Sequence, residues 1–382
     1  MTFPAAEFRA RTARMQAEMA AAEIDALLLT TAPDIYYATG FLTRFWESPA
    51  RPWFVLVPGA GDPVAVIPAI GAELMGRTWL ADIRTWVSPN PDDEGVSLLA
   101  AAIAEHVPPS GRLGLPMGTE THLRMPLGDY LRLLPMIAPR AVVDGSGPVH
   151  RTREIKTEAE IARLREICRI AARAFDRVQD IAGPGRPLDA VFRDFQALCL
   201  SEGADWVSYV AGGAGPGGYG DVISPADARP LADGDLLMLD TGAVKDGYFC
   251  DFDRNWAIGR ADDSLRRAHD TLFAATEAGI AAARPGATAE EVHDAIVARI
   301  RADGAEPLGG RLGHGLGLSL TEWPSLIPGD GTPFRAGMVL TIEPGLQIAP
   351  GRIMVHEENI VLREGGAELL SPRAPADLPV LR

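Results

Sequence analysis

The 382-residue sequence is poor in cysteine and lysine and contains no long apolar run. Its three cysteines, Cys168, Cys199 and Cys250, are scattered, with no CxxC motif and no paired spacing. A disulfide framework is therefore not expected, and a reducing cytoplasm fits best. No apolar stretch approaches the roughly 18 residues that a membrane helix needs, and the first residues lack the basic start and apolar middle of a signal peptide. We expect a cytoplasmic protein without a membrane contact.

Positive charge is also scarce. The formal net charge is −15, and Lys156 and Lys245 are the only lysines, so arginine supplies nearly all of the positive charge. A phosphate backbone would repel such a chain, which argues against nucleic acid as a partner. The hydrophobic content of 47% is that of an ordinary globular protein. The length favours two domains because single cores stop growing near roughly 250–300 residues.

The first 150 residues have the pattern of an α/β domain. Residues 8–23 read as an amphipathic helix, and the apolar run at residues 24–29 predicts a buried strand. Helical patterns separate several further predicted strands. These strands lie at residues 53–57, 64–67, 111–115 and 141–143. A charged stretch at residues 151–156 leads into a long predicted helix from about Glu158, and we place the domain boundary after residue 150.

Residues 151–382 contain a candidate internal repeat. A Pro-Gly pair at residues 184–185 and a Gly-Ala pair at residues 203–204 recur at residues 285–286 and 304–305, both at an offset of 101. Between these pairs each copy reads as one amphipathic helix. Strand-like segments that end in carboxylates follow each copy. We therefore expect two halves that face each other across one site.

Two of these acids belong to the first half. Asp240 ends an apolar strand, and Asp251 follows a turn at residues 246–247. Antiparallel pairing would bring Asp240 and Asp251 side by side. Two buried like charges are costly unless a cation neutralises them.

The second half contributes a histidine and two more acids. His314 stands among glycines, where close backbone approach is possible. Glu343 ends another strand, and Glu357 lies in a strand-like segment. A single strand-end acid is usually a solvated turn residue, but the five-residue set in matching halves favours a metal site. Four carboxylates and one imidazole suit two hard or borderline divalent ions, which can hold a shared hydroxide as nucleophile.

These motifs resemble the pita-bread metallohydrolases, a family that includes prolidase, aminopeptidase P, methionine aminopeptidase and the metal-free creatinase. Residues 24–29 and 36–41 are similar to the creatinase-type N-terminal domain, and residues 153–161 are similar to the linker that opens the catalytic domain. The spacing of the five metal residues is also similar to that of prolidase. The resemblance implies an α+β protein in which a creatinase-type α/β domain (1–150) precedes a pseudo-twofold pita-bread catalytic domain (151–382).

The resemblance also implies a role for each metal residue. Asp251 and Glu357 would bridge two divalent ions, Asp240 would bind one ion, and His314 and Glu343 would bind the other. Glu343 would also act as the proton shuttle. Mn²⁺ is the first expectation because oxygen ligands predominate, with Zn²⁺, Co²⁺ or Fe²⁺ as alternatives. The resemblance further implies a homodimer that acts on a dipeptide or another small molecule.

Three positions depart from the peptidases of this family. Residues 221–224 contain no histidine where the family has one, Thr321 takes the place of a second histidine, and Val355 takes the place of an arginine. In the family these groups bind the scissile carbonyl and help to stabilise the tetrahedral intermediate. Their absence argues against Xaa-Pro peptidase activity, and the loss of the first histidine argues against creatinase chemistry.

Several residues are candidates to replace these groups. Asp253 lies two residues after Asp251 and hence on the same face, as an extra ligand or supporting acid; the alternative is a surface acid paired with Arg254. His356 adjoins Glu357, although strand alternation points it to the opposite face. Thr321 and Trp323 are expected to line the substrate pocket, with a packing role as the alternative.

Three further residues are candidates for substrate binding. Tyr219 lies in a glycine-rich loop and could donate to a substrate oxygen, or could be a plain loop residue. Arg44 and Arg51 lie in a loop at residues 43–53 that is rich in Arg and Trp. In the family, a loop of this domain often reaches the partner subunit's active site. Either arginine could there bind a substrate carboxylate in bidentate fashion.

Three functional readings remain open at this point. The leading one is a two-metal hydrolase that acts on a small amide, dipeptide or modified amino acid. A metal-dependent lyase that acts on a small zwitterionic substrate is the second. A non-catalytic binding protein on the same scaffold is the third, but such relatives usually lose metal ligands, and all five are present here.

Overall fold

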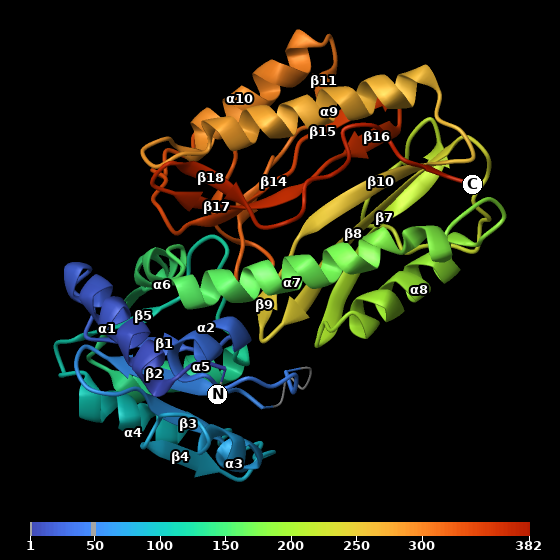
Figure 1. Cartoon of the computed structure of the whole chain (residues 1–382). Coiled ribbons are helices and arrows are strands. Elements are labelled where there is room, and N and C mark those ends of the chain that lie inside the picture. The colour runs from blue at the N-terminus through green and yellow to red at the C-terminus, as the bar shows by residue number, and fades with distance from the viewer. Residues whose placement is uncertain (1, 47–50) are drawn as a thin grey trace. The chain divides into compact units, whose positions relative to one another are not determined.

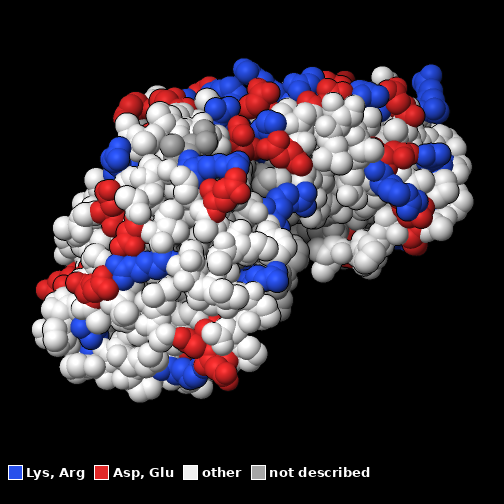
Figure 2. All heavy atoms as spheres, turned by 90° about the horizontal axis from the view of Figure 1, so that it is seen from below, with Lys and Arg blue, Asp and Glu red and all other residues white. Residues whose placement is uncertain are grey.

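A computed structural model describes residues 2–46 and 51–382, and it divides into two compact units, Met1–Arg153 and Glu154–Arg382 (Figure 1). Residues 47–50, which belong to the predicted Arg- and Trp-rich loop, lie outside the described residues. Among the described residues, no helix combines the length and the apolar content that crossing a membrane would require. On the face in Figure 2, acidic and basic side chains are interspersed.

The N-terminal unit is built on a mixed sheet of strand order β4-β3-β2-β1-β5-β6. The strands predicted from the apolar runs are present, and β4 was not predicted because its side chains are only partly buried. The strands are β1 (Ala26–Leu29), β2 (Phe54–Pro58), β3 (Val64–Pro68), β4 (Ile83–Trp86), β5 (Arg112–Leu115) and β6 (Ala141–Asp144).

Helices cover both faces of this sheet, which explains why its central strands are apolar at every position. Side chains of α4 and α5 pack on one face, and α1 packs against β2, α2 and α6. The helices are α1 (Ala5–Ala21), α2 (Ala32–Thr39), α3 (Ala72–Met75), α4 (Val96–His106), α5 (Leu127–Ile137) and α6 (Ser146–Arg153), with a short 3₁₀ turn η1 (Ala69–Gly71) before α3.

The C-terminal unit consists of two similar halves, each with a helix pair followed by a sheet (Figure 1). In the first half the sheet order is β19-β10-β8-β7, and β9 pairs with β8. Its elements are α7 (Glu158–Asp176), η2 (Val178–Asp180), α8 (Leu188–Ser201), β7 (Trp206–Pro216), β8 (Asp235–Lys245), β9 (Tyr248–Phe249) and β10 (Phe252–Ile258), completed by the C-terminal strand β19 (Val380–Leu381).

The second half repeats this arrangement with the sheet order β13-β12-β14-β17-β18 and a small sheet β11-β15-β16. Its α10 begins 101 residues after α8, as the repeat predicts. Its elements are α9 (Asp263–Ala282), α10 (Ala289–Ala302), β11 (Glu306–Pro307), β12 (His314–Gly315), β13 (Glu322–Ser325), β14 (Val339–Ile342), β15 (Gly345–Ala349), β16 (Arg352–Val355), β17 (Glu358–Arg363) and β18 (Gly366–Leu369).

The strand expected at residues 353–362 is in fact two strands. β16 ends at Val355 and β17 begins at Glu358, and the two strands belong to different sheets. His356 and Glu357 form the link between them, so the alternation of one continuous strand does not apply at this point. This break places the Glu357 side chain where two sheets meet.

A buried ion pair connects the entry of α7 to the second sheet. The Lys156 ammonium donates to the Glu322 carboxylate at 2.9 Å, and the two side chains are 2% and 6% exposed. Glu322 also accepts from the backbone N–H groups of Leu318 and Ser319. Because both charges are out of water, each depends on the other. The pair thereby holds β13 and the loop before it against the start of α7.

Replacing Lys156 with methionine should lower the free energy of unfolding by about 3–5 kcal/mol, because the Glu322 charge would stay buried without its cation. Denaturant unfolding measures this change. The matched control is Lys245→Met at the only other lysine, whose bond to Asp205 is solvent-exposed and is worth at most about 1 kcal/mol. The double replacement Lys156→Met and Glu322→Gln should recover much of the loss. Equal effects of the two lysine replacements would contradict this account.

Candidate functional site

The two aspartates of the first half lie on one face of the β8–β10 hairpin, but not in the predicted register. Asp240 pairs directly with Asp253, and Phe252 pairs with Thr241. The prediction that Asp251 stands beside Asp240 was therefore wrong by two residues. Because side chains alternate along a strand, Asp251 shares the face of Asp253 and lies diagonally across from Asp240. This hairpin gathers three acids rather than two.

Tyr209 links two of these acids, and the sequence reading missed it. Its hydroxyl bonds the Asp240 carboxylate at 3.2 Å and also contacts Asp251 Oδ1. The register of β7 on β8 shifts between Val207 and Val210, which re-aims the tyrosine. A Cβ at Gly242 would collide with the Tyr209 ring, so glycine is needed there. The glycine at position 242, opposite an irregular strand, was the feature that could have indicated the position of Tyr209.

His314 is held with one ring nitrogen toward the acids. Its Nδ1 lies 2.8 Å from the Gly315 carbonyl oxygen, and because a carbonyl only accepts, Nδ1 carries the proton. The other nitrogen, Nε2, faces Asp251 Oδ2 at 3.3 Å and Glu343 Oε2 at 3.7 Å. A ring held through Nδ1 by a backbone carbonyl, with Nε2 toward carboxylates, is typical of a metal-binding histidine.

The glycines around His314 are needed for close packing, as the sequence indicates. A Cβ at Gly313 would meet the Thr341 carbonyl oxygen, and one at Gly315 would meet the Trp323 carbonyl oxygen. Gly313 also has φ +143°, which other residues rarely adopt. These contacts place β12 tightly between β13 and β14 and fix the direction of the His314 ring.

Glu343 and Glu357 complete the cluster from neighbouring strand ends. β14 pairs with β17 so that Ile342 stands opposite Glu358, which brings the residues next to them together. The backbone N–H of Glu357 donates to Asp253 Oδ1 at 2.6 Å. Asp253 therefore supports the backbone of Glu357 from inside the cluster. The Asp253 side chain is buried and accepts from the Asn255 side chain. Asp253 is therefore not a surface acid whose carboxylate pairs with Arg254.

Burial and neighbouring charges shift the pKa values of Asp240, Glu357 and His314. Burial raises the pKa of Asp240 well above its usual value, and the Asp251 and Asp253 charges raise it further. Burial and the Asp251 charge likewise raise the pKa of Glu357 well above its usual value. Burial opposes charge on His314, but Glu343 and Asp251 outweigh it and raise the His314 pKa. Cations are needed for all the acids to ionise together.

The donor set fits divalent metal ions. Ligand atoms of Asp251, His314 and Glu357 lie within 4.8 Å of one another, and all three residues are buried. Asp240 Oδ1 and Glu357 Oε1 are buried without a hydrogen-bond partner among the described residues. Buried carboxylate oxygens without donors are costly, and a coordinated cation would satisfy them.

Neighbouring residues hold the ligands in place. The Asn359 side chain accepts from the Asp251 backbone N–H at 3.0 Å and also donates to the Asp251 carbonyl oxygen. On the opposite face of β10, the Arg254 guanidinium donates to the backbone carbonyl oxygens of Asp253 and Glu357 at 2.5 and 3.3 Å. Arg254 also pairs with the fully buried Glu358. The charges behind the cluster are therefore mutually compensated.

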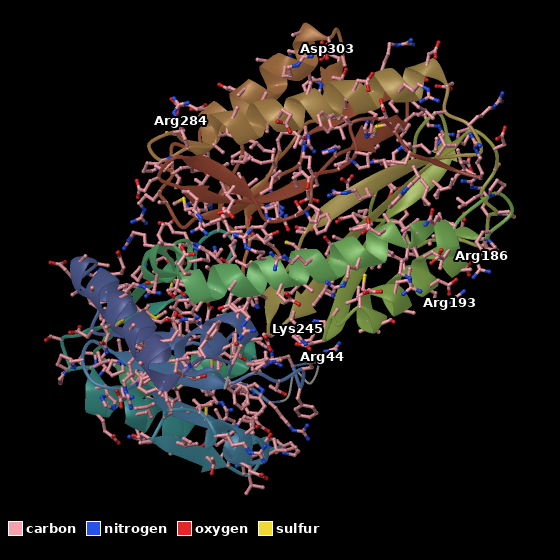
Figure 3. All side chains as sticks on the ribbon, viewed as in Figure 1. Arg44, Arg186, Arg193, Lys245, Arg284 and Asp303 are labelled. Atoms are coloured by element: carbon pink, nitrogen blue, oxygen red, sulfur yellow. The ribbon has the colours of Figure 1, made fainter. Side chains whose placement is uncertain are left out.

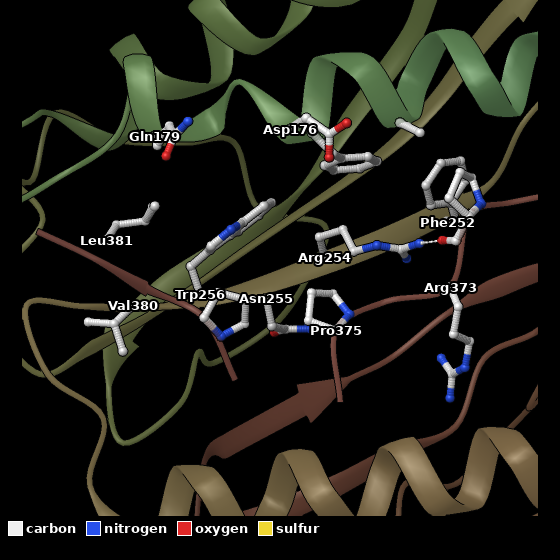
Figure 4. A pocket seen from close by; sticks show the side chains of 14 residues that line it. Asp176, Gln179, Phe252, Arg254, Asn255, Trp256, Arg373, Pro375, Val380 and Leu381 are labelled. Atoms are coloured by element: carbon white, nitrogen blue, oxygen red, sulfur yellow. Dashed lines mark hydrogen bonds between the residues drawn. The ribbon is translucent and has the colours of Figure 1, made fainter. Parts of the chain in front are cut away.

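A separate pocket of about 340 Å³ lies on that opposite face. Figure 4 shows Arg254 and Arg373 among the side chains that line it, together with Trp256. Arg373 pairs with Glu358 and Glu277. The alternation of β10 directs Asp253 to the cluster and Phe252, Arg254 and Trp256 to this pocket. The pocket and the acidic cluster are thus separated by the strand itself.

His356 and Tyr219 do not join the cluster, and the expectation of direct roles for them is corrected. His356 Nδ1 bonds Thr276 Oγ1 of α9 at 2.9 Å, and the ring is buried against that helix. Tyr219 is 1% exposed, accepts from the Val355 backbone N–H at 2.6 Å and bonds Asn255. Both side chains are already satisfied inside the protein, so neither is placed to meet a substrate.

Thr321 and Trp323 lie on the loop and strand that follow His314. Trp323 Nε1 donates to Thr332 Oγ1 at 3.1 Å. Thr321 Oγ1 accepts from Arg311 Nη2 at 3.4 Å, and Arg311 Nε is 3.9 Å from Glu343 Oε1. Arg311 was not predicted, although a charged residue within a glycine-rich stretch was a usable signal.

Arg44 and Arg51 belong to the N-terminal unit. The Arg51 guanidinium lies 5.3 Å from the Phe45 ring centroid. The backbone carbonyl oxygen of Arg51 accepts a hydrogen bond from the Arg124 side chain. Figure 3 labels Arg44 in the same loop. Their expected role in binding a substrate carboxylate stays a prediction.

Comparison with known proteins agrees with this geometry. Residues 162–364 match metallopeptidase family M24, and residues 11–155 match the creatinase/prolidase N-terminal domain. The probable dipeptidase PepE of Mycobacterium tuberculosis is 31% identical over 377 residues, which cover 96% of this chain and 94% of that protein. The Xaa-Pro dipeptidase of Pyrococcus horikoshii is 26% identical over 351 residues, with 91% and 92% coverage.

Solved structures show the same architecture. Dipeptidase PepE from Mycobacterium ulcerans has a TM-score of 0.85 at 27% identity, and the match covers 99% of each chain. A prolidase from Thermococcus sibiricus has a TM-score of 0.87 at 23% identity, which shows the likeness of fold. The predicted fold class and family resemblance are confirmed. The chain belongs to metallopeptidase family M24, with a creatinase/prolidase N-terminal domain, and is a metal-dependent hydrolase.

Proposed function

We propose that the protein is a dinuclear metal-dependent hydrolase that cleaves the amide or peptide bond of a dipeptide or another small substrate. The observation that carries this proposal is the buried cluster of Asp251, His314 and Glu357, whose ligand atoms lie within 4.8 Å of one another. The unpartnered buried oxygens of Asp240 and Glu357 support a cation at the same place.

The ligands divide between two ions as the family resemblance implies. Asp240, Asp251, His314, Glu343 and Glu357 would together hold both ions. Mn²⁺ is the preferred ion because four of these five ligands are carboxylates, and Zn²⁺, Co²⁺ and Fe²⁺ are alternatives. When bound, the ions would polarise the scissile carbonyl and activate the attacking water.

The chain's own residues supply proton transfer and positioning. The Glu343 side chain is 21% exposed, against 3% for the neighbouring His314 and 5% for Asp251. It can therefore take a proton from the attacking water and deliver it to the leaving amine, a role worth roughly 10²–10⁴ in rate. Tyr209 holds the Asp240 and Asp251 carboxylates in fixed orientation, and Asp253 does the same for the Glu357 backbone.

Proteins named dipeptidase and Xaa-Pro dipeptidase among the similar chains support a small peptide as substrate. Thr321 and Val355, and the absence of histidine at residues 221–224, argue that Xaa-Pro bonds are not preferred. We further propose a cytoplasmic homodimer in which Arg44 or Arg51 acts at the partner subunit's site.

Metal content and turnover should separate the ligands from the proton shuttle. Purified protein should hold up to two divalent ions per chain, and chelation should abolish hydrolysis. Asp251→Ala should release at least one ion because a bridge is lost. Glu343→Gln should retain more metal but lose roughly 10²–10⁴ in kcat, since an amide cannot relay protons. Elemental analysis and kinetics measure both quantities. Near-normal turnover of metal-loaded Glu343→Gln would refute the shuttle.

A panel of dipeptides and small amides tests the substrate class. Xaa-Pro dipeptides should be cleaved poorly, because removal of one comparable oxyanion donor typically costs roughly 10²–10³ in rate. Dipeptides without proline, each assayed with the same metal-loaded protein, provide the control. Cleavage of Xaa-Pro dipeptides as the best substrates of the panel would show that other groups replace the missing histidines and arginine.

Removal of metal should have a pH-dependent effect on stability. The pKa values of Asp240 and Glu357 are raised in the folded metal-free protein, above the roughly 4 of an unfolded carboxyl. Their contribution to stability is present below that pH and is lost as the pH rises through the folded values, by up to ~1.4 kcal/mol per pH unit for each proton. The bound ions remove this loss, so the Tm gap between metal-loaded and metal-free protein should widen as the pH rises.

Calorimetry of both forms between pH 5 and 8 checks this expectation. Burial lowers the pKa of His356, which acts in the opposite direction because neutral His356 contributes stability that is lost as pH falls. That effect is common to both forms and cancels in the gap. A gap that narrowed with rising pH would contradict the assignment of the ions to these acids.

A further inference from the structure

The link between β16 and β17 carries Glu357 and belongs to neither strand. β16 ends at Val355 and β17 begins at Glu358, and the two strands lie in different sheets. The strand ladders end on either side of the link, so its backbone groups need other hydrogen-bond partners. Because Glu357 is one of the proposed metal ligands, whatever holds the link also sets the direction of a ligand carboxylate.

Three side chains from the first half of the catalytic unit supply these partners. The Val355 backbone N–H donates to the Tyr219 hydroxyl at 2.6 Å, and the Asn255 side-chain amide donates to the Val355 carbonyl oxygen at 2.7 Å. The Glu357 backbone N–H donates to Asp253 Oδ1 at 2.6 Å. Each bond joins the backbone of the second half to a side chain of the first. We call Tyr219, Asn255 and Asp253 the link clamp.

Asn255 is the central member of the link clamp. Besides the Val355 carbonyl oxygen, its amide nitrogen also reaches Asp253 Oδ2 at 3.2 Å. Its Oδ1 accepts from the Tyr219 hydroxyl at 3.4 Å. The three residues of the clamp are at most 6% exposed. An amide that both donates and accepts in this way is held in one orientation. Asn255 therefore connects the other two side chains to each other and to the link.

The link clamp also connects Glu357 to the strand beside Asp251. Asp253 and Asn255 both lie on β10, and because they are two residues apart they share one face of it. Asp251 directly precedes this strand. Ligand atoms of Asp251 and Glu357 lie within 4.8 Å of each other. The clamp thus joins the two chain segments whose spacing decides whether these two carboxylates can meet the same ions.

The backbone of Tyr219 fixes its place against β16. Its N–H donates to the Ile353 carbonyl oxygen at 3.3 Å, and the Ile353 N–H donates to the Tyr219 carbonyl oxygen at 2.9 Å. The preceding Gly218 has φ +125°, and a Cβ there would lie 3.0 Å from the Ile353 carbonyl oxygen. Glycine is needed for this close approach. The glycine-rich loop at residues 217–220 therefore places the Tyr219 hydroxyl at the link.

The direction of the Glu357 carboxylate depends on its backbone. Among the residues that the structure describes, Glu357 Oε1 is buried without a hydrogen-bond partner. That oxygen has no donor of its own to orient it, so the position of the link is the main restraint. A ligand that is already oriented binds an ion without a further cost of ordering, which is why the outer partners of metal ligands affect metal affinity.

We propose that Asn255 is a positioning residue of the metal site. Together with Tyr219 and Asp253 it holds the link so that the Glu357 carboxylate faces the other ligands, and it thereby raises the affinity for divalent ions. Asn255 acts through the backbone of the link and not by contact with the ions or the substrate. This inference rests on the proposed metal-dependent function and adds the residues that orient one of its ligands in advance.

Titration of metal-stripped protein with Mn²⁺ tests the proposal. Asn255→Leu keeps the approximate size of the side chain and removes its hydrogen bonds, so the Kd for Mn²⁺ should rise roughly 10- to 100-fold. Asn255→Thr keeps one donor and should fall between that variant and the wild type. Tyr219→Phe should raise the Kd by a smaller factor than Asn255→Leu, because Asn255 still holds the Val355 carbonyl oxygen. Isothermal titration calorimetry measures each Kd.

Asp235→Leu is the matched control. Asp235 lies at the start of β8, is 2% exposed, and accepts from the Ala232 backbone N–H at 2.9 Å. Its replacement should lower the Tm of the metal-free protein, as Asn255→Leu does, but should leave the Kd within about twofold. Equal rises of the Kd in both variants would indicate a general loss of stability and would overturn the positioning role. If Asn255→Leu does not fold, Asn255→Thr and Tyr219→Phe decide the question by the same comparison.

Turnover at rising Mn²⁺ concentration separates this inference from the proposed function. In Asn255→Leu the activating concentration should rise by the same factor as the Kd, while kcat at saturating Mn²⁺ stays within about threefold, because bound ions then hold Glu357 themselves. A wild type that cleaves no dipeptide or amide but binds Mn²⁺ in an Asn255-dependent way would refute the hydrolase proposal and leave the positioning role standing. An active wild type whose Kd is unchanged in folded Asn255→Leu would do the reverse. A wild type that binds no Mn²⁺ would overturn both.

Discussion

The repulsion between buried carboxylates is the constraint on which the rest of the catalytic unit depends. Asp251, Asp253 and Glu357 are buried close to Asp240, and burial raises the pKa of Asp240 and Glu357. Such a group is unfavourable in a protein interior unless protons or metal ions neutralise it. The surrounding fold is therefore best understood as a support that holds these acids where a cation can satisfy them.

Each half of the catalytic unit contributes to that support in its own way. The first half contributes acids from the β8–β10 hairpin. The Tyr209 ring packs against Gly242, and its hydroxyl bonds Asp240. The second half contributes His314, whose neighbours Gly313 and Gly315 leave no room for a side chain of their own. It also contributes Glu357, which lies in the link between β16 and β17. Asn359 crosses from the second half to fix the Asp251 backbone. Neither half could hold two ions alone.

Much of this arrangement could be predicted from the sequence. Apolar runs located most strands of the N-terminal unit, and the repeat located the helix pair α8 and α10. Residue type, spacing and the family resemblance led to the five proposed ligands, and the structure brings ligand atoms of Asp251, His314 and Glu357 within 4.8 Å of one another. The ligands' assignment to particular ions stays a proposal.

The remaining errors concern direction and register, which depend on contacts between distant segments. The pairing of Asp240 with Asp253 follows from the shape of the turn and the position of β7, not from the hairpin sequence alone. Tyr219 and His356 are polar and close in sequence to functional residues, yet both are satisfied by buried partners. Arg311 was overlooked because its significance comes from Glu343, 32 positions later, and from the short side chain of Thr321.

The most direct test of the central claim is anomalous diffraction from crystals of the protein grown with Mn²⁺. The account predicts two strong anomalous peaks between Asp251 and Glu357, one also contacted by Asp240 and the other by His314 and Glu343. Catalytically active crystals with no anomalous peak at these residues would contradict it.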